Sequence, residues 1–324
     1  MHAVARELLE CDVGFTPFYA GAGVDAMRRL GLLEWTIGGD KLRGRCMDYL
    51  RGHGLRIDMH GREGGYDLVV TCTDLVVPEN VRSGRIVLVQ EGIFDPPGIL
   101  TPLCRRLKWM PRALGGTSLT GQSNLYNRFC VASDGYRDLF VSQGVDPRKL
   151  AVTGIPNFDD CARYLKNDFP HRGYVLVCTS DARETFKRDD RVALVRRAVQ
   201  VAAGRPLIFK LHPNEDHTRA TTEIRRSAPD ALVYATGSAE EMIANADEVF
   251  TQWSSTAFVA LALGKTLHSN FSVAELRRLL PQQNGGRSAR RIGRICREVM
   301  NSSLPRPNEP SMTPLPHAAG AVFA

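Results

Sequence analysis

The 324-residue sequence has no uninterrupted apolar run of about 18 residues, the length that a membrane-spanning helix requires. It also lacks the apolar core of a signal peptide, because Arg6, Glu7 and Glu10 interrupt the N-terminal segment MHAVARELLECD. That segment has a helical pattern, whereas an α/β domain normally opens with a strand. We therefore expect either a fold without its first strand or a truncated start.

Paired cysteines are missing as well. The eight cysteines are scattered singly with no C-x-x-C spacing, which argues against a zinc site. Cys130 and Cys178 lie inside apolar runs, where a thiol behaves as a small hydrophobic side chain. This pattern is typical of a reducing compartment, so we expect a cytoplasmic protein with no metal ion.

Aromatic residues are few, at 7%, although the formal net charge is +7. A positive balance favours anionic partners, but basic residues spread along the chain with few aromatics beside them argue against nucleic acid. One short segment, LCRRLKWMPRAL, contains Arg105, Arg106, Lys108, Trp109 and Arg112. It favours either peripheral contact with the anionic inner face of the membrane or an ordinary solvated basic helix.

Strand-like apolar runs alternate with helix-like amphipathic segments in both halves of the chain, most regularly in the second half. There, Ser238–Glu241 and Ser272–Glu275 match the S-x-x-E capping box and predict two helix starts. The alternation predicts an α/β protein with two Rossmann-like domains facing one another across a cleft. We expect an N-terminal domain at 1–152, a C-terminal domain with the last helix at 153–303, and a Pro-rich disordered tail at 304–324.

Polar clusters follow two strands of the second half, one βα unit apart. The first contains His212, Asn214 and Glu215 after the run PLIFKL, and the second is Ser254-Ser255-Thr256 at the start of an apolar helix. Ligands of doubly wound sheets bind at the carboxyl ends of strands, so we expect both clusters in one site.

Each cluster has a functional and a structural interpretation. His212 can donate a hydrogen bond to a phosphate or stabilise a leaving group, or it can simply cap the next helix. The hydroxyls of Ser254, Ser255 and Thr256, with the free amides beside them, suit a phosphate but are also common helix N-caps.

Two further segments carry candidate residues. Arg183 and Lys187 in TSDARETFKRDD could clamp a pyrophosphate, or belong to a solvated helix start. In Gln90-Glu91-Gly92, directly after the strand IVLV, Glu91 could act as a general base on an acceptor hydroxyl. We expect the cleft to be lined by Gln90, Gly92, Gly154, Asn157 and Gln252.

The motifs KLHPNE and EVFTQWSSTAFVALALGK resemble the second domain of GT-B-fold glycosyltransferase-like proteins. The groups most similar are the capsule polysaccharide synthesis proteins and the CDP-glycerol glycerophosphotransferases. The segment QEGIFDPPGIL looks like the Glu-Gly segment of capsular Kdo-transferase-type proteins. VTGIPNFDD is similar to the Gly-x-Pro-x-x-Asp entry into the second domain, which UDP-N-acetylglucosamine 2-epimerases also carry. The resemblance covers about residues 85–300.

The sequence also departs from these families. Phe258 and Val259 stand where the epimerases have acidic residues for the ribose and for catalysis. The pair Gln252-Trp253 replaces the Asp-Tyr of the glycerophosphotransferases, and Glu91-Gly92 falls near the position of their catalytic His-Gly. These differences weaken an epimerase interpretation and leave the nucleotide to be held in another way.

The resemblance implies a transferase that needs no cofactor, with a nucleotide-activated sugar as its substrate. It would move a sugar, or a related phosphorylated group, to a surface-polysaccharide or lipid-linked acceptor of the cell envelope, as in capsule polysaccharide biosynthesis. The negative charge of the leaving group would be offset without a metal ion, by His212, Arg183, Lys187 and Ser254–Thr256. Glu91 would be the base. Two alternatives stay open: a 2-epimerase-like enzyme, and a catalytically inactive GT-B module that binds a polymer or a partner protein.

Overall fold

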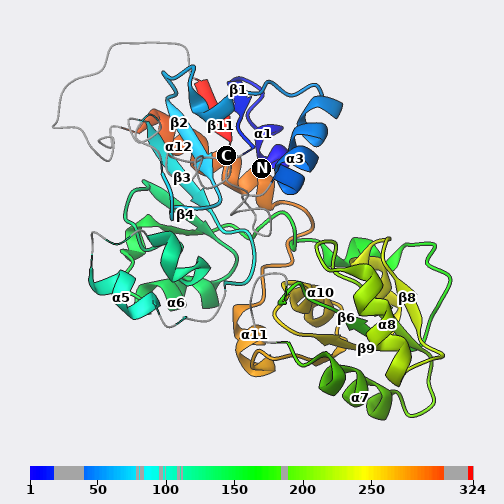
Figure 1. Ribbon diagram of the computed structural model, residues 1–324. Coiled ribbons are helices and arrows are strands. Elements are labelled where there is room, and N and C mark those ends of the chain that lie inside the picture. The colour runs from blue at the N-terminus through cyan, green and yellow to red at the C-terminus, as the bar shows by residue number, and fades with distance from the viewer. Residues whose placement is uncertain are drawn as a thin grey trace. The chain divides into compact units, whose positions relative to one another are not determined.

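The computed structural model describes residues 1–17, 40–77, 80, 84–94, 98, 100–107, 110, 112–183, 189–302 and 320–323. The chain divides into two compact units, one of Met1–Asp159 with Asn284–Ala324 and the other of Asp160–Gln283. Each unit is built on one sheet whose neighbouring strands all run parallel (Figure 1). The predicted α/β class with two Rossmann-like domains is confirmed.

The first unit has the strand order β1-β11-β2-β3-β4-β5. These strands are β1 (Asp12–Phe15), β2 (Leu68–Thr71), β3 (Arg85–Val89), β4 (Arg128–Val131), β5 (Leu150–Val152) and β11 (Gly320–Phe323). Its described α-helices are α1 (His2–Ala5), α3 (Asp40–Gly52), α5 (Thr101–Arg106), α6 (Asp134–Ser142) and α12 (Ser288–Asn301). Short 3₁₀ turns are η1 (Met59–Gly61), η2 (Arg112–Gly115), η3 (Thr117–Leu119) and η4 (Pro147–Lys149).

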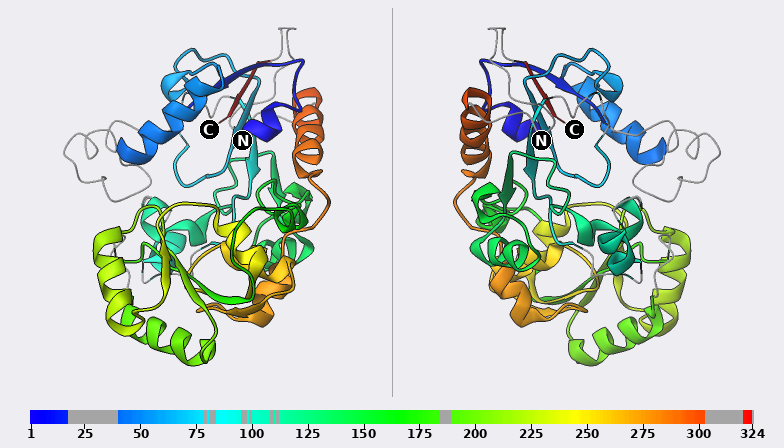
Figure 2. Two further views of the ribbon diagram at one scale, coloured as in Figure 1. Left: turned by 90° about the vertical axis from the view of Figure 1, so that its right-hand side faces the viewer. Right: turned by 90° about the vertical axis from the view of Figure 1, so that its left-hand side faces the viewer.

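Helix α12 belongs to the first unit, which corrects its predicted place in the second domain. Ile292, Cys296 and Val299 form its buried face and join the core of β2, β3, β4 and α1. Figure 2 shows α12 and α1 side by side against this sheet. The 3.6-residue period of a helix shows that one face is buried, but it does not say against which sheet. The first boundary, at Asp159, lies close to the predicted one at 152.

The C-terminal strand β11 lies between β1 and β2 and pairs with both in parallel. The prediction of a disordered tail is therefore wrong for Gly320–Phe323, while 303–319 lie outside the described residues. Strands β1 and β2 offer backbone N–H and C=O groups that need partners, and Gly320–Phe323 bonds to them on both sides. This pairing stabilises Gly320–Phe323 as a strand, although its composition alone does not predict one. In the strand order, β11 is therefore second, next to the edge strand β1.

The second unit has the strand order β10-β9-β6-β7-β8. Its strands are β6 (Tyr174–Cys178), β7 (Leu207–Lys210), β8 (Leu232–Tyr234), β9 (Ala246–Thr251) and β10 (Thr266–His268). Its described helices are the 3₁₀ helix η5 (Cys161–Leu165), α7 (Arg191–Ala202), α8 (His217–Ser227), α9 (Ala239–Asn245), α10 (Thr256–Ala262) and α11 (Val273–Leu279). Both predicted capping serines accept a backbone hydrogen bond, Ser238 from Glu241 N and Ser272 from Glu275 N.

The strand order shows at which point of the second sheet a ligand is expected to bind. From β6 the chain proceeds to β7 and β8 on one side and then returns to β9 and β10 on the other side. The order therefore reverses between β6 and β9. In open parallel sheets this switch point, at the carboxyl ends of the strands, is where ligands bind.

Candidate functional site

Three loops meet at the carboxyl edge of the second sheet, and they follow the adjacent strands β7, β6 and β9. Ser180, after β6, donates a hydrogen bond of 2.7 Å to Oε1 of Gln252, after β9. Asn214, after β7, donates through Nδ2 to Oδ2 of Asp181 at 3.4 Å. The loop after β6 thus connects the two polar clusters that the sequence predicts to share one site.

A buried set of charges lies beneath these loops. Arg191, the first residue of α7, is 3% exposed, and its Nη2 is 2.6 Å from Glu215 Oε1 and 3.1 Å from Asp189 Oδ2. Asp189 Oδ1 accepts a bond of 2.6 Å from Gln252 Nε2. Both carboxylate side chains are fully buried. Buried charges are tolerated only when they are paired, so this guanidinium stabilises two carboxylates at once.

Glu215 holds the loop that carries the histidine. Its Oε2 accepts hydrogen bonds from Thr179 Oγ1 at 2.5 Å and from His212 N at 3.3 Å, and Thr179 Oγ1 is 3.0 Å from the same His212 N. The predicted role of Glu215 in contacting the donor does not suit a fully buried side chain. We assign it a positioning role, in which it fixes the backbone at His212.

The ring of His212 is held in one tautomer. Its Nδ1 accepts a hydrogen bond of 3.3 Å from Asn214 N, so in the neutral ring the proton is on Nε2. Asp181 Oδ2 is 3.6 Å from the same Nδ1, beyond hydrogen-bond reach. The side chain is 34% exposed, and among the described residues Nε2 has no partner. His212 therefore presents one N–H donor that can serve a ligand.

The Ser254–Thr256 segment is less open than the sequence suggests. Ser254 Oγ accepts bonds from Thr256 N at 3.3 Å and from Thr256 Oγ1 at 2.9 Å. Helix α10 has only seven residues, so its dipole is small. Phe258 and Val259 are fully buried in it, and they leave no carboxylate at those positions to bind a ribose.

Arg183 is engaged by acidic neighbours. Its guanidinium donates bonds of 2.9 and 2.6 Å to Glu223, and its Nε is 3.3 Å from Asp189 Oδ2. The hydrogen bond from Arg183 lowers the pKa of Glu223. An incoming phosphate would have to compete with this carboxylate. Lys187, its predicted companion, lies outside the described residues.

In the first unit, Gln90 fixes the loop after β3. Its Oε1 accepts a bond of 2.9 Å from Ala132 N, and its Nε2 donates one of 3.0 Å to Gly92 O. Gln90 is 1% exposed and Gly92 is buried, so neither forms an open wall. Glu91 between them is exposed at the carboxyl end of the sheet, as a general base would need to be.

The Gly154-x-Pro-x-x-Asp159 motif has a structural explanation. Gly154 has φ of +75°, and an added Cβ would lie 2.3 Å from Ser288 Oγ, so only glycine fits there. Asp159 Oδ2 accepts a bond of 2.8 Å from Ser288 N at the start of α12. The motif joins two crossing segments of the first unit. Gly154 is buried, contrary to its prediction as a wall residue, whereas Asn157 is exposed.

Sequence reasoning misses Thr179, Ser180, Asp189 and Arg191. Asp189 and Arg191 lie in or next to a charged stretch that resembles a solvated helix start. Their partners come from strands far apart in sequence, so a local pattern contains no signal for them. The signal that was available is the polar pair Thr179-Ser180 directly after the buried strand β6.

Two searches of the described part of the chain are negative. No three histidine, cysteine or acidic side chains within it are grouped so that they could hold a metal ion. None of its helices combines the length and the apolar character needed to cross a bilayer.

No family model matches the sequence, and no curated protein matches it. The structure is similar to that of UDP-GlcNAc 2-epimerase from Neisseria meningitidis bound to UDP-GlcNAc, with TM-score 0.52 and 10% identity over 88% of this chain and 99% of that one. A protein from Listeria monocytogenes assigned as a UDP-N-acetylglucosamine 2-epimerase gives TM-score 0.50 and 11% identity over 90% and 88%. The wall teichoic acid polymerase TagF gives TM-score 0.46 and 8% identity over 91% and 90%. The first two likenesses establish a shared fold, of the GT-B type.

Proposed function

We propose that this protein is a GT-B transferase that moves a sugar, or a related phosphorylated group, from a nucleotide-activated donor to a surface-polysaccharide or lipid-linked acceptor. The observation that carries the proposal is the tautomer of His212, which leaves one N–H at the carboxyl edge of the second sheet with no partner among the described residues. The same fold holds a nucleotide sugar in the N. meningitidis enzyme.

His212 would act on the donor phosphates. Negative charge builds on the leaving nucleotide as its bond to the transferred group breaks, and a preorganised N–H donor stabilises that charge. Asn214 adds an amide beside it, and Ser255 adds a hydroxyl at the switch point. Because Glu215 fixes the His212 backbone, the donor group needs little reorganisation when the ligand arrives.

Glu91 would accept the proton of the acceptor hydroxyl. Its exposed carboxylate follows β3 in the first unit, on a loop that Gln90 holds at both ends. We expect Glu91→Gln to abolish group transfer while nucleotide binding by the second unit is unchanged. Glu298→Gln, an exposed site on α12, is the matched control. Full transfer by Glu91→Gln would remove Glu91 from the reaction.

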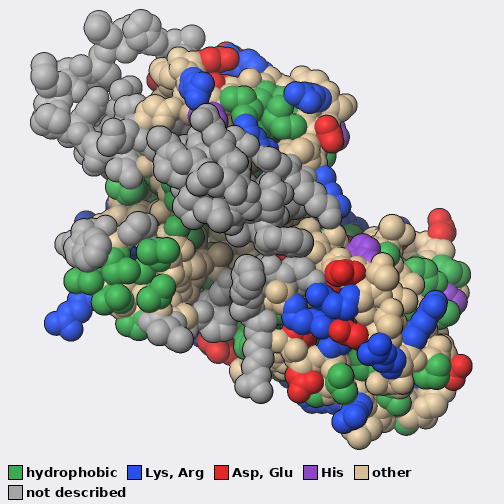
Figure 3. Space-filling view, in the orientation of Figure 1, with side chains coloured by type: hydrophobic (Ala, Val, Ile, Leu, Met, Phe, Trp, Pro, Cys, Tyr) green, Lys and Arg blue, Asp and Glu red, His purple; other side chains and the backbone are tan. Residues whose placement is uncertain are grey.

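A lipid-linked acceptor would bring the protein to a membrane, and the first unit offers a surface for this contact. Leu100, Leu103 and Leu114 are 44%, 44% and 53% exposed around α5 and η2, beside the exposed Arg105 and Arg106. Figure 3 shows hydrophobic side chains gathered over α5 and α6. Apolar side chains rimmed by cations suit an anionic bilayer. Binding to anionic vesicles, lost in Leu103→Glu and absent with neutral vesicles, would support this contact.

A 2-epimerase-like activity is the second candidate, because the two similar structures with the highest scores given above bear that assignment. The absence of carboxylates at Phe258 and Val259 speaks against it. The two reactions differ in their need for an acceptor. Conversion of a nucleotide sugar in the absence of any acceptor would favour the epimerase, whereas a strict requirement for acceptor favours the transferase.

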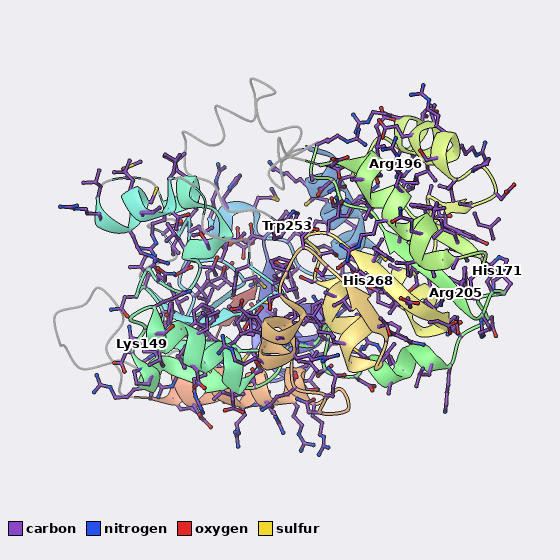
Figure 4. The ribbon with its side chains drawn as sticks, turned by 90° about the horizontal axis from the view of Figure 1, so that it is seen from below. Lys149, His171, Arg196, Arg205, Trp253 and His268 are labelled. Carbon is purple, nitrogen blue, oxygen red and sulfur yellow. The ribbon has the colours of Figure 1, made fainter. Side chains whose placement is uncertain are left out.

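Thermal unfolding against a panel of nucleoside diphosphates and CMP tests the proposal. A ligand at about 100 times its Kd adds about 2.7 kcal/mol to the free energy of unfolding, which gives a clear rise in Tm. We expect one nucleotide to give this rise, and His212→Ala to remove it. His171→Ala is the control, because the His171 ring bonds to Tyr234 and lies well away from Trp253 of the loop after β9 (Figure 4). If no nucleotide raises the Tm, the donor site fails and a binding module is the better interpretation.

A further inference from the structure

A pocket of about 410 Å³ lies in the second unit between α7 and the carboxyl ends of β9 and β10. Its volume is within the usual range of ligand sites, about 300 to 1,000 Å³. The residues that line it all belong to this unit and are all described. None of these residues contacts a ligand in the proposed reaction. Gln252 has only a structural role there, because it bonds to Ser180 and Asp189 of the segment after β6.

Aromatic side chains form the apolar part of the pocket. Phe250 is 2% exposed and stacks on His268, with ring centroids 4.2 Å apart and planes at 14°. Trp253 is 37% exposed and meets Phe271 edge to face at 4.8 Å and 87°. Whichever ring supplies the edge, at least one face of the Trp253 indole has no aromatic neighbour among the described residues. Figure 4 labels Trp253 and His268 on the strand side of this pocket.

Polar groups with both donors and acceptors surround this aromatic surface. Asp190 caps α7 through Oδ1, which accepts a bond of 2.9 Å from Ala193 N, and its side chain is exposed in the pocket wall. Asn270 adds an exposed amide. Ser269 is held by a bond of 3.2 Å from its Oγ to Gln252 O. Asp190 and Ser269 are fixed by these bonds before any ligand binds, which lowers the entropic cost of binding.

We propose that this pocket is a saccharide subsite that binds a neutral sugar ring on the open face of Trp253. A sugar ring has an apolar face of C–H groups, and its edge has hydroxyls that both donate and accept hydrogen bonds. Carboxylate, amide and hydroxyl groups around an aromatic face match that chemistry. This inference adds a sugar-binding site to the proposed function. A role of the bound sugar in group transfer rests on that proposed function.

A phosphate fits the pocket less well. It would meet the carboxylate of Asp190, and among the described residues of the wall Arg197 is the only Lys or Arg. A nucleobase is distinguished from a sugar by experiment, because a base also stacks on an indole and has N–H donors for the carboxylate of Asp190. The location suits a sugar as well, because Trp253 directly precedes Ser254 and both lie in the loop that follows β9. The saccharide would thus be held next to the proposed donor site.

Tryptophan fluorescence can report on this pocket. Trp35 and Trp109 are the other two tryptophans of the chain, so Trp35→Phe with Trp109→Phe leaves Trp253 as the single emitter. The probes are glucose, galactose, N-acetylglucosamine, cellobiose and chitobiose, each raised to about fifty times a Kd of 1 mM. We expect a saturable change in emission with at least one of them. No saturable response from any probe overturns the inference.

Substitutions at Trp253 and Asp190 test whether the sugar binds in this pocket. Saturation-transfer NMR on the protein with all its tryptophans should show roughly tenfold weaker sugar binding for Trp253→Ala, with part of the affinity regained in Trp253→Phe. Asp190→Asn keeps a capping side chain and removes the charge, and it should weaken binding about threefold or more. Asp216→Asn makes the same change at the N-cap of α8 and should leave binding unchanged. Sugar binding that survives Trp253→Ala overturns the inference.

The nucleotide panel separates this inference from the proposed function. If Trp253 responds to nucleotides but to no sugar, the pocket is not a saccharide subsite and the transferase proposal stands. If sugars bind through Trp253 while no nucleotide stabilises the protein, the subsite stands and the transferase proposal fails.

Discussion

The loop after β3 in the first unit and the loops after β6 and β7 in the second unit are stabilised by different chemistry. Gln90, a neutral amide, holds the first with two hydrogen bonds to backbone groups. The loops of the second unit are held by ions, with Arg191 between the buried carboxylates of Asp189 and Glu215. The first arrangement leaves one exposed carboxylate, Glu91, and the second leaves one imidazole N–H, at His212.

The difference teaches what each edge is suited to do. A neutral clamp places no charge near Glu91, so the carboxylate can accept a proton in a mostly aqueous setting. Buried ion pairs hold the loops rigidly, so the N–H donor of His212 is already in place for negative charge that develops on a phosphate. The second edge should therefore be far more sensitive than the first to the loss of one side chain.

The largest effect should come from Arg191. Arg191→Met removes the cation paired with buried Glu215 and leaves Asp189 with Arg183 alone. Removing one partner of a buried ion pair typically costs about 3–5 kcal/mol of folding free energy. Urea unfolding of the second unit measures the loss. Arg196→Met, on the same helix at an exposed position, should change stability by no more than about 0.5 kcal/mol. Equal effects of the two substitutions would show that the buried network does not stabilise the unit.

Gln90 should matter less. Gln90→Leu leaves Ala132 N–H and Gly92 C=O without their partner, and an unsatisfied buried group costs about 1–3 kcal/mol. We expect the first unit to lose stability in that range in the same urea experiment. Gln200→Leu on the exposed side of α7 is the matched control. A loss as large as that of Arg191→Met would remove the contrast between the two edges.

The smallest effect concerns pH and the rim of the ion network. The bond from Arg183 lowers the pKa of Glu223 below its ordinary value of 4.5. A carboxyl group whose folded pKa is lower stabilises the fold above about pH 4.5, and this contribution is lost as pH falls through the folded pKa. Glu223→Gln should therefore lower stability near pH 7 by about 1 kcal/mol or less, and this loss should shrink as the pH falls below about 4.5. A difference that grows on acidification would contradict this sign.

Local patterns in the sequence predict the alternation of strands and helices, and they predict specific caps. Ser238 and Ser272 both accept the backbone bond expected of an N-cap. These features depend on residues three positions apart, so the sequence contains all the information they need.

Features that depend on distant segments are not predictable in this way. The buried face of α12 does not reveal that its partner is the first sheet, and the composition of 304–324 does not reveal that Gly320–Phe323 completes that sheet. The pairing of Arg191 with Glu215 joins a helix start to a loop beyond the next strand. A short motif is equally ambiguous, since Gly154 is predicted to line a cleft, whereas in the structure it packs against Ser288.

The central claim is that the second unit presents His212 as an Nε2–H donor to a phosphate. The most direct test is ¹⁵N NMR of the imidazole nitrogens, with the His212 signals among the eight histidines assigned by His212→Gln. We predict an unprotonated Nδ1 and a protonated Nε2 in the free protein, and a shift of the Nε2–H signal when the stabilising nucleoside diphosphate is added. A proton on Nδ1, or an Nε2–H signal that the nucleotide leaves unchanged, would contradict the claim.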